Sequence, residues 1–254
     1  MTRRKLLSFT TRILRYGAKK LHSEWDVQPP VFLVNFKAYI YGSKASAFCK
    51  EAERISLKYD VPLIVVPQLV DLARIAEETE LPVFAPYIDP IRPGRGMGSV
   101  LPEAVKEAGA VGSFLNHAER PMPVSEIANA VKRADEVGLA TLVAADSPED
   151  VSAIVACGPN MMLTEPPSLI GSGRSVGSVD GKYVSDSIAA VKKLNPKIIV
   201  GSAAGVSSGK DVIEIIRLGA EITGATSGIL AARDPVNVLD DMVRGLKEAW
   251  AETH

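Results

Sequence analysis

From residue 31 onward, short apolar runs alternate with longer amphipathic stretches, and this alternation limits the possible folds more than any other feature. The stretches between the runs, such as KASAFCKEAERISLKY, have helical spacing. This order is typical of parallel strands joined by crossover helices. The runs predicted to form strands are residues 31–35, 62–66, 82–85, 111–115, 140–144, 160–164, 197–201 and 221–226.

Eight strands within roughly 220 residues fit a closed barrel better than an open sheet. The hydrophobic content of 46% and charged content of 23% are ordinary for a chain with a large core. No linker rich in Pro, Gly or Ser interrupts the region. We therefore predict an α/β fold with a single (β/α)8 barrel over residues 31–254. An open, doubly wound sheet is the structural alternative, since a strand count from one sequence is uncertain.

Residues 1–30 form a basic N-terminal extension of different character. They carry seven Lys or Arg against two acidic residues, whereas the rest of the chain is net acidic. We predict an amphipathic helix here and leave three interpretations open. The extension packs on the barrel or is a frayed tail, it contacts an anionic membrane, another subunit or an acidic partner, or it is a targeting peptide. The basic face holds Lys5, Arg12, Arg15 and Lys19, and the apolar face holds Leu6, Phe9, Ile13 and Leu14.

Composition excludes several classes of function. The formal net charge of -1 argues against general nucleic-acid binding. No apolar run reaches the roughly 18–20 residues that a membrane-spanning helix needs. Cys49 and Cys157 are too far apart for a metal or redox motif, and we interpret them as free or buried thiols in a reducing compartment.

Polar residues follow the predicted strands where a barrel would build its site. Asn35 and Lys37 follow the first strand, His117 and Glu119 the fourth, and Glu165 the sixth. The spacing of Asn35 and Lys37 would point both side chains to the same side of an extended chain. Each residue has a plainer interpretation: a solvated lysine, a structural histidine, a carboxylate that ends a strand.

The two carboxylates, Glu119 and Glu165, differ in their sequence neighbours. Glu119 could simply pair with the adjacent Arg120, which would contribute little energy. Glu165 precedes Pro166 and Pro167, which restrict the backbone on both sides of it. A residue that only ended a strand would not need that carboxylate.

Glycine-rich turns follow the sixth, seventh and eighth predicted strands, at residues 171–173, 204–209 and 227–228. Backbone N–H groups in such turns can bind a phosphate without a basic side chain. Any one turn could be glycine-rich for its own conformation. Three in succession favour a barrel enzyme that acts on a small phosphorylated metabolite, with a carboxylate, a histidine and a lysine converging on it.

Five segments together resemble the triosephosphate isomerases, and specifically the shorter archaeal type. The similarity keeps its order and spacing from about residue 31 to 245 and leaves the extension outside. The segments are VNFKAY (34–39), VVPQLVDL (65–72), LPEAVKEAGAVGSFLNHAER (101–120), TEPPSLIGSG (164–173) and GVSSGKDV (205–212).

The resemblance implies a TIM barrel and interconversion of dihydroxyacetone phosphate and D-glyceraldehyde 3-phosphate through an enediolate. It assigns Glu165 as the base and His117 as the neutral electrophile that polarises the substrate oxygens. It makes Lys37 the cation that steadies the enediolate, Asn35 its positioning neighbour, and Glu119 a buried carboxylate partner of Lys37.

The resemblance also implies a lid over residues 166–176, a phosphate cradle and no cofactor or metal. The enzyme would act on a small phosphorylated sugar in cytoplasmic glycolysis and gluconeogenesis, as a homo-oligomer (dimer or tetramer). The cradle residues would be Gly171, Ser172, Gly173, Ala204, Gly205, Ser227 and Gly228.

Several positions depart from the family pattern around these groups. Ala118 and Ala144 stand where Ser and Cys are usual, near Glu165, and Ala203 stands where a Gly is usual in the phosphate turn. Smaller Gly224 and Ala225 should loosen the eighth strand's side of the core. The third loop carries Pro86, Tyr87 and Met97 in place of the residues usual at a subunit contact. The alternatives are an isomerase of another phosphorylated sugar such as a tetrose phosphate, a weakly active relative kept for binding, and an unrelated phosphate-binding barrel.

Overall fold

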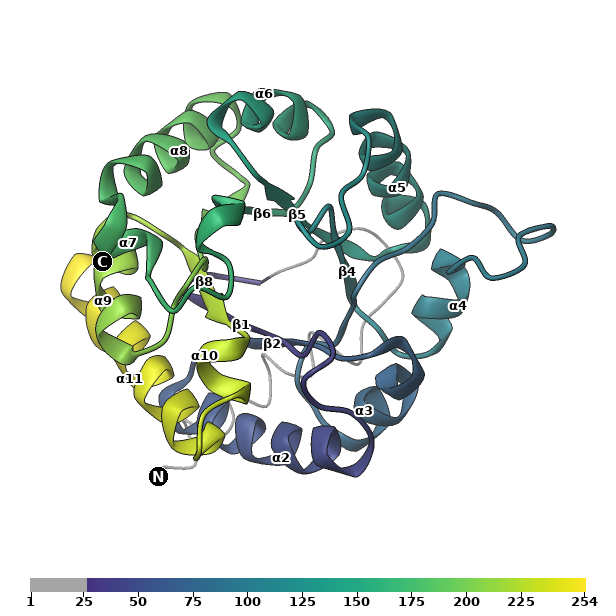
Figure 1. The fold of residues 1–254 in the computed structure, drawn as a ribbon. Helices are drawn as coiled ribbons and strands as arrows, with labels where there is room; N and C mark the ends of the chain where they lie inside the picture. The colour runs from purple at the N-terminus through teal and green to yellow at the C-terminus, as the bar shows by residue number, and fades with distance from the viewer. Residues whose placement is uncertain (1–26) are drawn as a thin grey trace.

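A computed structural model describes residues 27–254, without the side chains of residues 148 and 149; the predicted basic helix lies outside this range. The described residues form an eight-stranded, all-parallel sheet surrounded by helices (Figure 1). Every predicted strand is present to within two residues at either end. The strands are β1 (Val31–Asn35), β2 (Leu63–Val66), β3 (Phe84–Ala85), β4 (Gly112–Leu115), β5 (Ala140–Ala145), β6 (Met161–Thr164), β7 (Ile199–Gly201) and β8 (Ile222–Ala225).

The sheet closes into a barrel, so the open-sheet alternative is wrong. Its strand order is β2-β1-β8-β7-β6-β5-β4-β3, and a bridge between Val65 and Val83 joins the two ends of that order. The Val65 N–H donates to the Pro82 carbonyl at 3.0 Å. Closure leaves no free sheet edge and brings the carboxyl ends of all eight strands to one face.

The longer helices cover the outside of the barrel (Figure 1). The helical segments are α2 (Gly42–Tyr59), η1 (Leu69–Asp71), α3 (Leu72–Glu78), α4 (Pro102–Glu107), α5 (Val124–Val137), α6 (Pro148–Ala156), η2 (Pro167–Leu169), α7 (Val176–Val179), α8 (Gly181–Leu194), α9 (Gly209–Arg217), α10 (Ser227–Leu230) and α11 (Pro235–Thr253). None in the described part of the chain is long and apolar enough to cross a membrane.

Local sequence fixes where several helices begin and end. Asp180 accepts a hydrogen bond from the Tyr183 N–H at 2.9 Å and caps α8, and Asp234 caps α11 in the same way through Asn237 at 3.1 Å. These caps satisfy amides that would otherwise lack a partner at a helix start. Gly138 ends α5 with a φ of 72°, a conformation that glycine adopts without a Cβ penalty.

Alternation along the strands separates two hydrophobic clusters. Inward side chains such as Leu33, Phe84 and Leu163 fill the barrel, while outward ones such as Phe32 and Val34 pack under the helices. Gly112 leaves room for the Phe84 ring, since a Cβ there would lie 2.4 Å from Phe84 Cζ.

The expected loosening around β8 is not found at Gly224. A Cβ at this position would lie 2.2 Å from the Leu33 carbonyl oxygen, which belongs to the paired strand β1. Glycine therefore lets the two strand backbones approach closely.

Candidate active site

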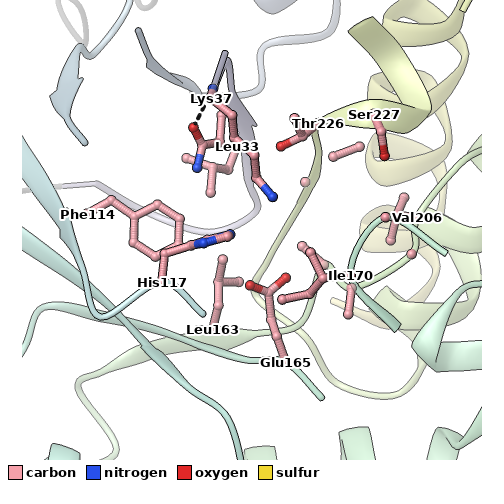
Figure 2. Close-up of a pocket in the computed structure, with 17 residues that line it drawn as sticks. Leu33, Lys37, Phe114, His117, Leu163, Glu165, Ile170, Val206, Thr226 and Ser227 are labelled. Carbon is pink, nitrogen blue, oxygen red and sulfur yellow. Dashed lines mark hydrogen bonds between the residues drawn. The ribbon is translucent and has the colours of Figure 1, made fainter. Parts of the chain in front are cut away.

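One cavity opens at the carboxyl ends of the strands and brings together the polar residues predicted from the sequence. Asn35, Lys37, His117 and Glu165 all line it, together with apolar side chains such as Leu33 and Leu163. Figure 2 shows the side chains of Lys37, His117 and Glu165 directed into a common space. A lysine, a histidine and a carboxylate from three separate strands therefore face one small volume.

Lys37 reaches the cavity by a turn. The extended geometry assumed from its spacing is wrong, because β1 ends at Asn35 and Lys37 has a φ of 45°, in the left-handed region. The Asn35 Oδ1 accepts the Lys37 N–H at 3.0 Å, and the Gln68 side-chain amide donates to the Lys37 carbonyl. These two side chains hold a backbone conformation that costs energy for a residue with a Cβ.

Glu119 pairs with Lys37 as expected, with 2.6 Å between Nζ and Oε1, but the expectation that it is buried is wrong. Its side chain is 61% exposed, whereas that of Lys37 is 15% exposed. Glu119 follows a turn beyond β4 at the rim, so water screens its charge. The guanidinium of Arg120 lies over the Tyr87 ring at 3.6 Å from its centroid, and so the alternative Glu119–Arg120 pair is not formed.

His117 is held neutral in one tautomer. Burial, and then the charge of Lys37, lowers its pKa to about 4. Its Nδ1 accepts the Glu119 N–H at 3.0 Å, so the ring proton belongs on Nε2. The Phe114 ring meets the imidazole edge to face, with centroids 5.5 Å apart. His117 can therefore offer a neutral N–H donor to the cavity at pH 7.

Sequence reasoning missed Asn116, which shapes the turn that carries His117. Asn116 has a φ of 55°, its side-chain amide donates to the Ala144 carbonyl at 2.9 Å, and its Oδ1 accepts the Met122 N–H at 2.8 Å. Asparagine tolerates this left-handed conformation better than most residues. An Asn directly after a predicted strand was the available signal.

Glu165 follows β6 with its backbone still in the ladder, since its N–H donates to the Ala145 carbonyl at 2.9 Å. The residue is only 7% exposed. Burial raises the pKa of its carboxyl to about 7, and the negative charge of Asp146 adds to this rise. The positive charge of Lys37 and a hydrogen bond from the Ala203 N–H lower the pKa but do not cancel the rise. A carboxyl with this pKa can accept and return a proton near neutral pH.

Residues 166–176 make a compact segment that lies against the turn after β7. The Ser172 hydroxyl donates to the Leu169 carbonyl at 2.8 Å and accepts the Arg174 N–H at 3.1 Å. The Val176 N–H donates to the Ala204 carbonyl at 3.0 Å. Side-chain and backbone bonds thus fix both the tip of the segment and its attachment to the neighbouring turn.

Several backbone amides are available at the same end of the cavity. Gly171, Ala204, Gly205 and Ser227 line it. Within residues 27–254, the N–H groups of Gly171, Gly205 and Ser227 donate no backbone hydrogen bond. Unpaired amides that converge on a cavity are suited to an anion such as phosphate.

The other three predicted cradle residues do not line this cavity in the described structure. Ser172 and Gly173 lie in the tip of the segment, and Gly173 has a φ of 69° that suits glycine. Gly228 allows close packing instead, because a Cβ there would lie 2.3 Å from the Val206 carbonyl oxygen. Their positions favour roles in shaping the turns.

Ala203 was expected to crowd a bound phosphate. It lines the cavity, and its backbone N–H also interacts with the Glu165 carboxylate, which partly offsets the rise in the pKa of that carboxyl. The residue therefore bears on Glu165 as well as on the cavity wall.

The described residues include no group of three or more His, Cys, Asp or Glu side chains placed to hold a metal ion. The chemistry that the side chains themselves supply is a base with a pKa near neutrality, a neutral N–H donor and a cation. This set can move a proton between adjacent carbons while stabilising negative charge on oxygen.

Comparison with known proteins gives one family. A family model described as triosephosphate isomerase matches residues 30–226. The triosephosphate isomerase of Methanobacterium bryantii is 40% identical over 218 residues, covering 85% of this chain and 96% of that protein. That of Sulfurisphaera tokodaii is 36% identical over 219 residues, covering 85% and 95%.

A solved structure shares the fold. The crystal structure of triosephosphate isomerase from Bartonella henselae aligns with a TM-score of 0.66, covering 89% of this chain and all of that one. Its sequence identity to this chain is 13%, so the likeness supports the barrel architecture alone.

Proposed function

Since this chain belongs to the triosephosphate isomerase family and is an aldose–ketose isomerase, we propose that the cavity at its strand ends interconverts dihydroxyacetone phosphate and D-glyceraldehyde 3-phosphate with Glu165 as the base. The observation that carries these roles is the convergence of Glu165, His117 and Lys37 on a cavity that also presents unpaired amides. The reaction is a step of glycolysis and gluconeogenesis.

The proton transfer runs through one carboxylate. The ionised Glu165 takes a proton from the carbon beside the substrate carbonyl, the electron pair moves onto the carbonyl oxygen, and an enediolate forms. Glu165 then returns the proton to the adjacent carbon. The pKa of about 7 leaves a substantial ionised fraction at neutral pH while keeping the base strong.

The enediolate oxygens need donors that do not themselves lose a proton. The Nε2–H of His117 is such a donor, because the low pKa of the ring keeps it neutral. Lys37 adds a positive charge on the same side, held by Glu119 at 2.6 Å. Both stabilise charge that develops during the reaction.

The phosphate would lie against the amides of Gly171, Gly205 and Ser227, with Ala204 beside them. Residues 166–176 act as the lid, with the turns at Ser172 and Gly173 shaping its tip. A closed lid excludes water from an intermediate that can otherwise eliminate phosphate. Gly228 supports this end of the cavity by letting α10 pack on the β7 turn.

A coupled isomerisation assay on the purified full chain tests the reaction. We expect turnover of triose phosphates with a higher kcat/KM than for a tetrose phosphate. Glu165→Asp withdraws the carboxylate by one methylene and should lower kcat about 100-fold with little change in KM.

The matched control is Glu126→Asp, the same change at an exposed position in the first turn of α5. It should leave both constants unchanged. A wild-type protein that binds triose phosphate without turning it over would contradict the proposed function. Full activity in Glu165→Asp would remove Glu165 from the role of base.

We also infer a homo-oligomer in a reducing compartment such as the cytoplasm. The loop between β3 and α4 projects from the barrel (Figure 1) and carries a fully exposed Met97, while Tyr41 is exposed before α2 and Val70 in η1. Exposed apolar side chains are suited to a subunit contact. Cys49 and Cys157 are free thiols. Light scattering on the purified chain tests the first inference: a mass of one chain would overturn it.

A further inference from the structure

Strand register places a second carboxylate beside the base. β5 and β6 pair through Ala144↔Leu163 and Ala145↔Thr164, and the Glu165 N–H continues this ladder to the Ala145 carbonyl. Asp146 follows directly after the last residue of β5, so its backbone lies beside that of Glu165. Neighbouring strand backbones lie about 4.8 Å apart, and the negative charge of Asp146 contributes to the raised pKa of the Glu165 carboxyl.

Asp146 and Glu165 each lie one residue beyond the end of a strand, Asp146 after β5 and Glu165 after β6. Glu165 lines the cavity, whereas Asp146 lies in the bend that leads to α6. Register alone thus brings two acidic groups together, although they are 19 positions apart in the chain.

The Asp146 carboxylate has little in its surroundings to stabilise its negative charge. Its Oδ1 is fully buried without a hydrogen-bond partner among the described residues, and the ion pairs of residues 27–254 do not include it. Burial, and then Asp150, raises the pKa of its carboxyl. A buried carboxylate oxygen without a donor is costly, so its presence beside a base calls for a reason.

The other groups that act on Glu165 do not carry a negative charge at neutral pH. Lys37 approaches from the end of β1 with the opposite sign, and His117 is neutral. Tyr183 of α8 lies near the same carboxylates; burial first, with Glu165 and Asp146 adding to it, raises the pKa of its phenol to about 12. The phenol is therefore uncharged at neutral pH. Asp146 is the negative group that acts on Glu165 against Lys37.

We propose that Asp146 is a positioning residue that acts on the isomerisation through Glu165: its adjacent carboxylate opposes negative charge on the base and so strengthens that base. This inference rests on the proposed function of Glu165. Asp146 does not line the cavity and has no direct contact with substrate to make. Its effect reaches the reaction only through the proton affinity of its neighbour.

Asp146→Asn removes the charge and keeps the shape. In profiles of kcat/KM against pH, we expect the acidic limb to move down by about one pH unit, the size typical for loss of a close like charge. The limiting kcat should fall about threefold, because a weaker base follows Brønsted behaviour. The variant would therefore outperform the wild type at low pH and lag behind it at high pH.

Asp150→Asn is the matched control, since Asp150 lies in α6 and its Oδ2 accepts from the Ser147 hydroxyl at 2.7 Å. It should leave the acidic limb in place. An unshifted limb in Asp146→Asn, or an equal loss of activity at every pH, would overturn the proposal, because a purely structural role gives those results.

A carbon NMR titration of the Glu165 carboxyl, assigned by comparison with Glu165→Gln, separates this proposal from the proposed function. If the wild type lacks isomerase activity, the proposed function fails on that result alone. The titration still reports whether Asp146→Asn lowers the pH at which Glu165 loses its proton. An unchanged titration would overturn the coupling between the two carboxylates.

Discussion

Glu165→Gln should make the protein more stable at alkaline pH while it removes the proposed base. The folded-state pKa of Glu165 is about 7 against an ordinary value of 4.5, so folding favours the protonated form. This group costs no stability below pH 4.5, and the cost grows as pH rises until it is complete above pH 7. A rise of about 2.5 pKa units corresponds to roughly 3 kcal/mol as an upper limit.

The amide escapes most of this cost because it carries no charge at any pH. Its oxygen can still accept the Ala203 N–H, but its NH2 group needs an acceptor, so we expect a net gain of about 1–3 kcal/mol at pH 8. For a chain of this size, each kcal/mol moves Tm by roughly 2–4 °C. The variant should therefore melt about 5 °C above the wild type at pH 8 and close to it at pH 5.

Thermal unfolding by circular dichroism at the two pH values measures this difference. Glu126→Gln, at an exposed position of α5, is the control and should show no pH-dependent gain. Equal stability of Glu165→Gln and wild type at pH 8 would refute the reasoning, because it would mean that the carboxylate is well solvated in the folded protein. A gain of the same size at pH 5 would also refute it.

Two further outcomes test the anion pocket and the electrophile. Gly205→Ala should destabilise the fold by about 2 kcal/mol or more and weaken inhibition by inorganic phosphate. The new Cβ would lie 1.9 Å from the Arg174 carbonyl oxygen, and the backbone there has a φ of 71°. The control is Gly158→Ala, at a φ of 76° with open space around it, which should cost less stability and leave phosphate inhibition unchanged. Nitrogen NMR of His117 should show a neutral ring with its proton on Nε2 at pH 6, and an imidazolium at that pH would contradict the assigned role.

Much of the fold follows from the sequence because each barrel strand is a short apolar run with no competing pattern. The eight runs predicted the strands, and the rule that barrel chemistry lies at strand carboxyl ends placed Asn35, Lys37, His117 and Glu165 at the same end. That rule depends only on chain direction and strand order, which a linear sequence contains.

The remaining features depend on register and exposure, which the sequence does not contain. Asp146 precedes SPED and is typical of a loop or helix start; only the pairing of β5 with β6 places it beside Glu165. Glu119 was expected to be buried, but the turn after β4 leaves it at the rim. The backbone of Ala203 is similarly invisible in a side-chain pattern, yet its N–H reaches the base.

The arrangement around Glu165 explains how a costly carboxylate can be kept at a strand end. Its backbone stays paired with Ala145, so the cost is confined to one side chain and does not spread into the ladder. The charge of Lys37 and the backbone of Ala203 lower the pKa of this carboxyl, but burial outweighs them. The carboxylate is therefore poorly solvated, and the rest of the barrel core bears the loss of stability.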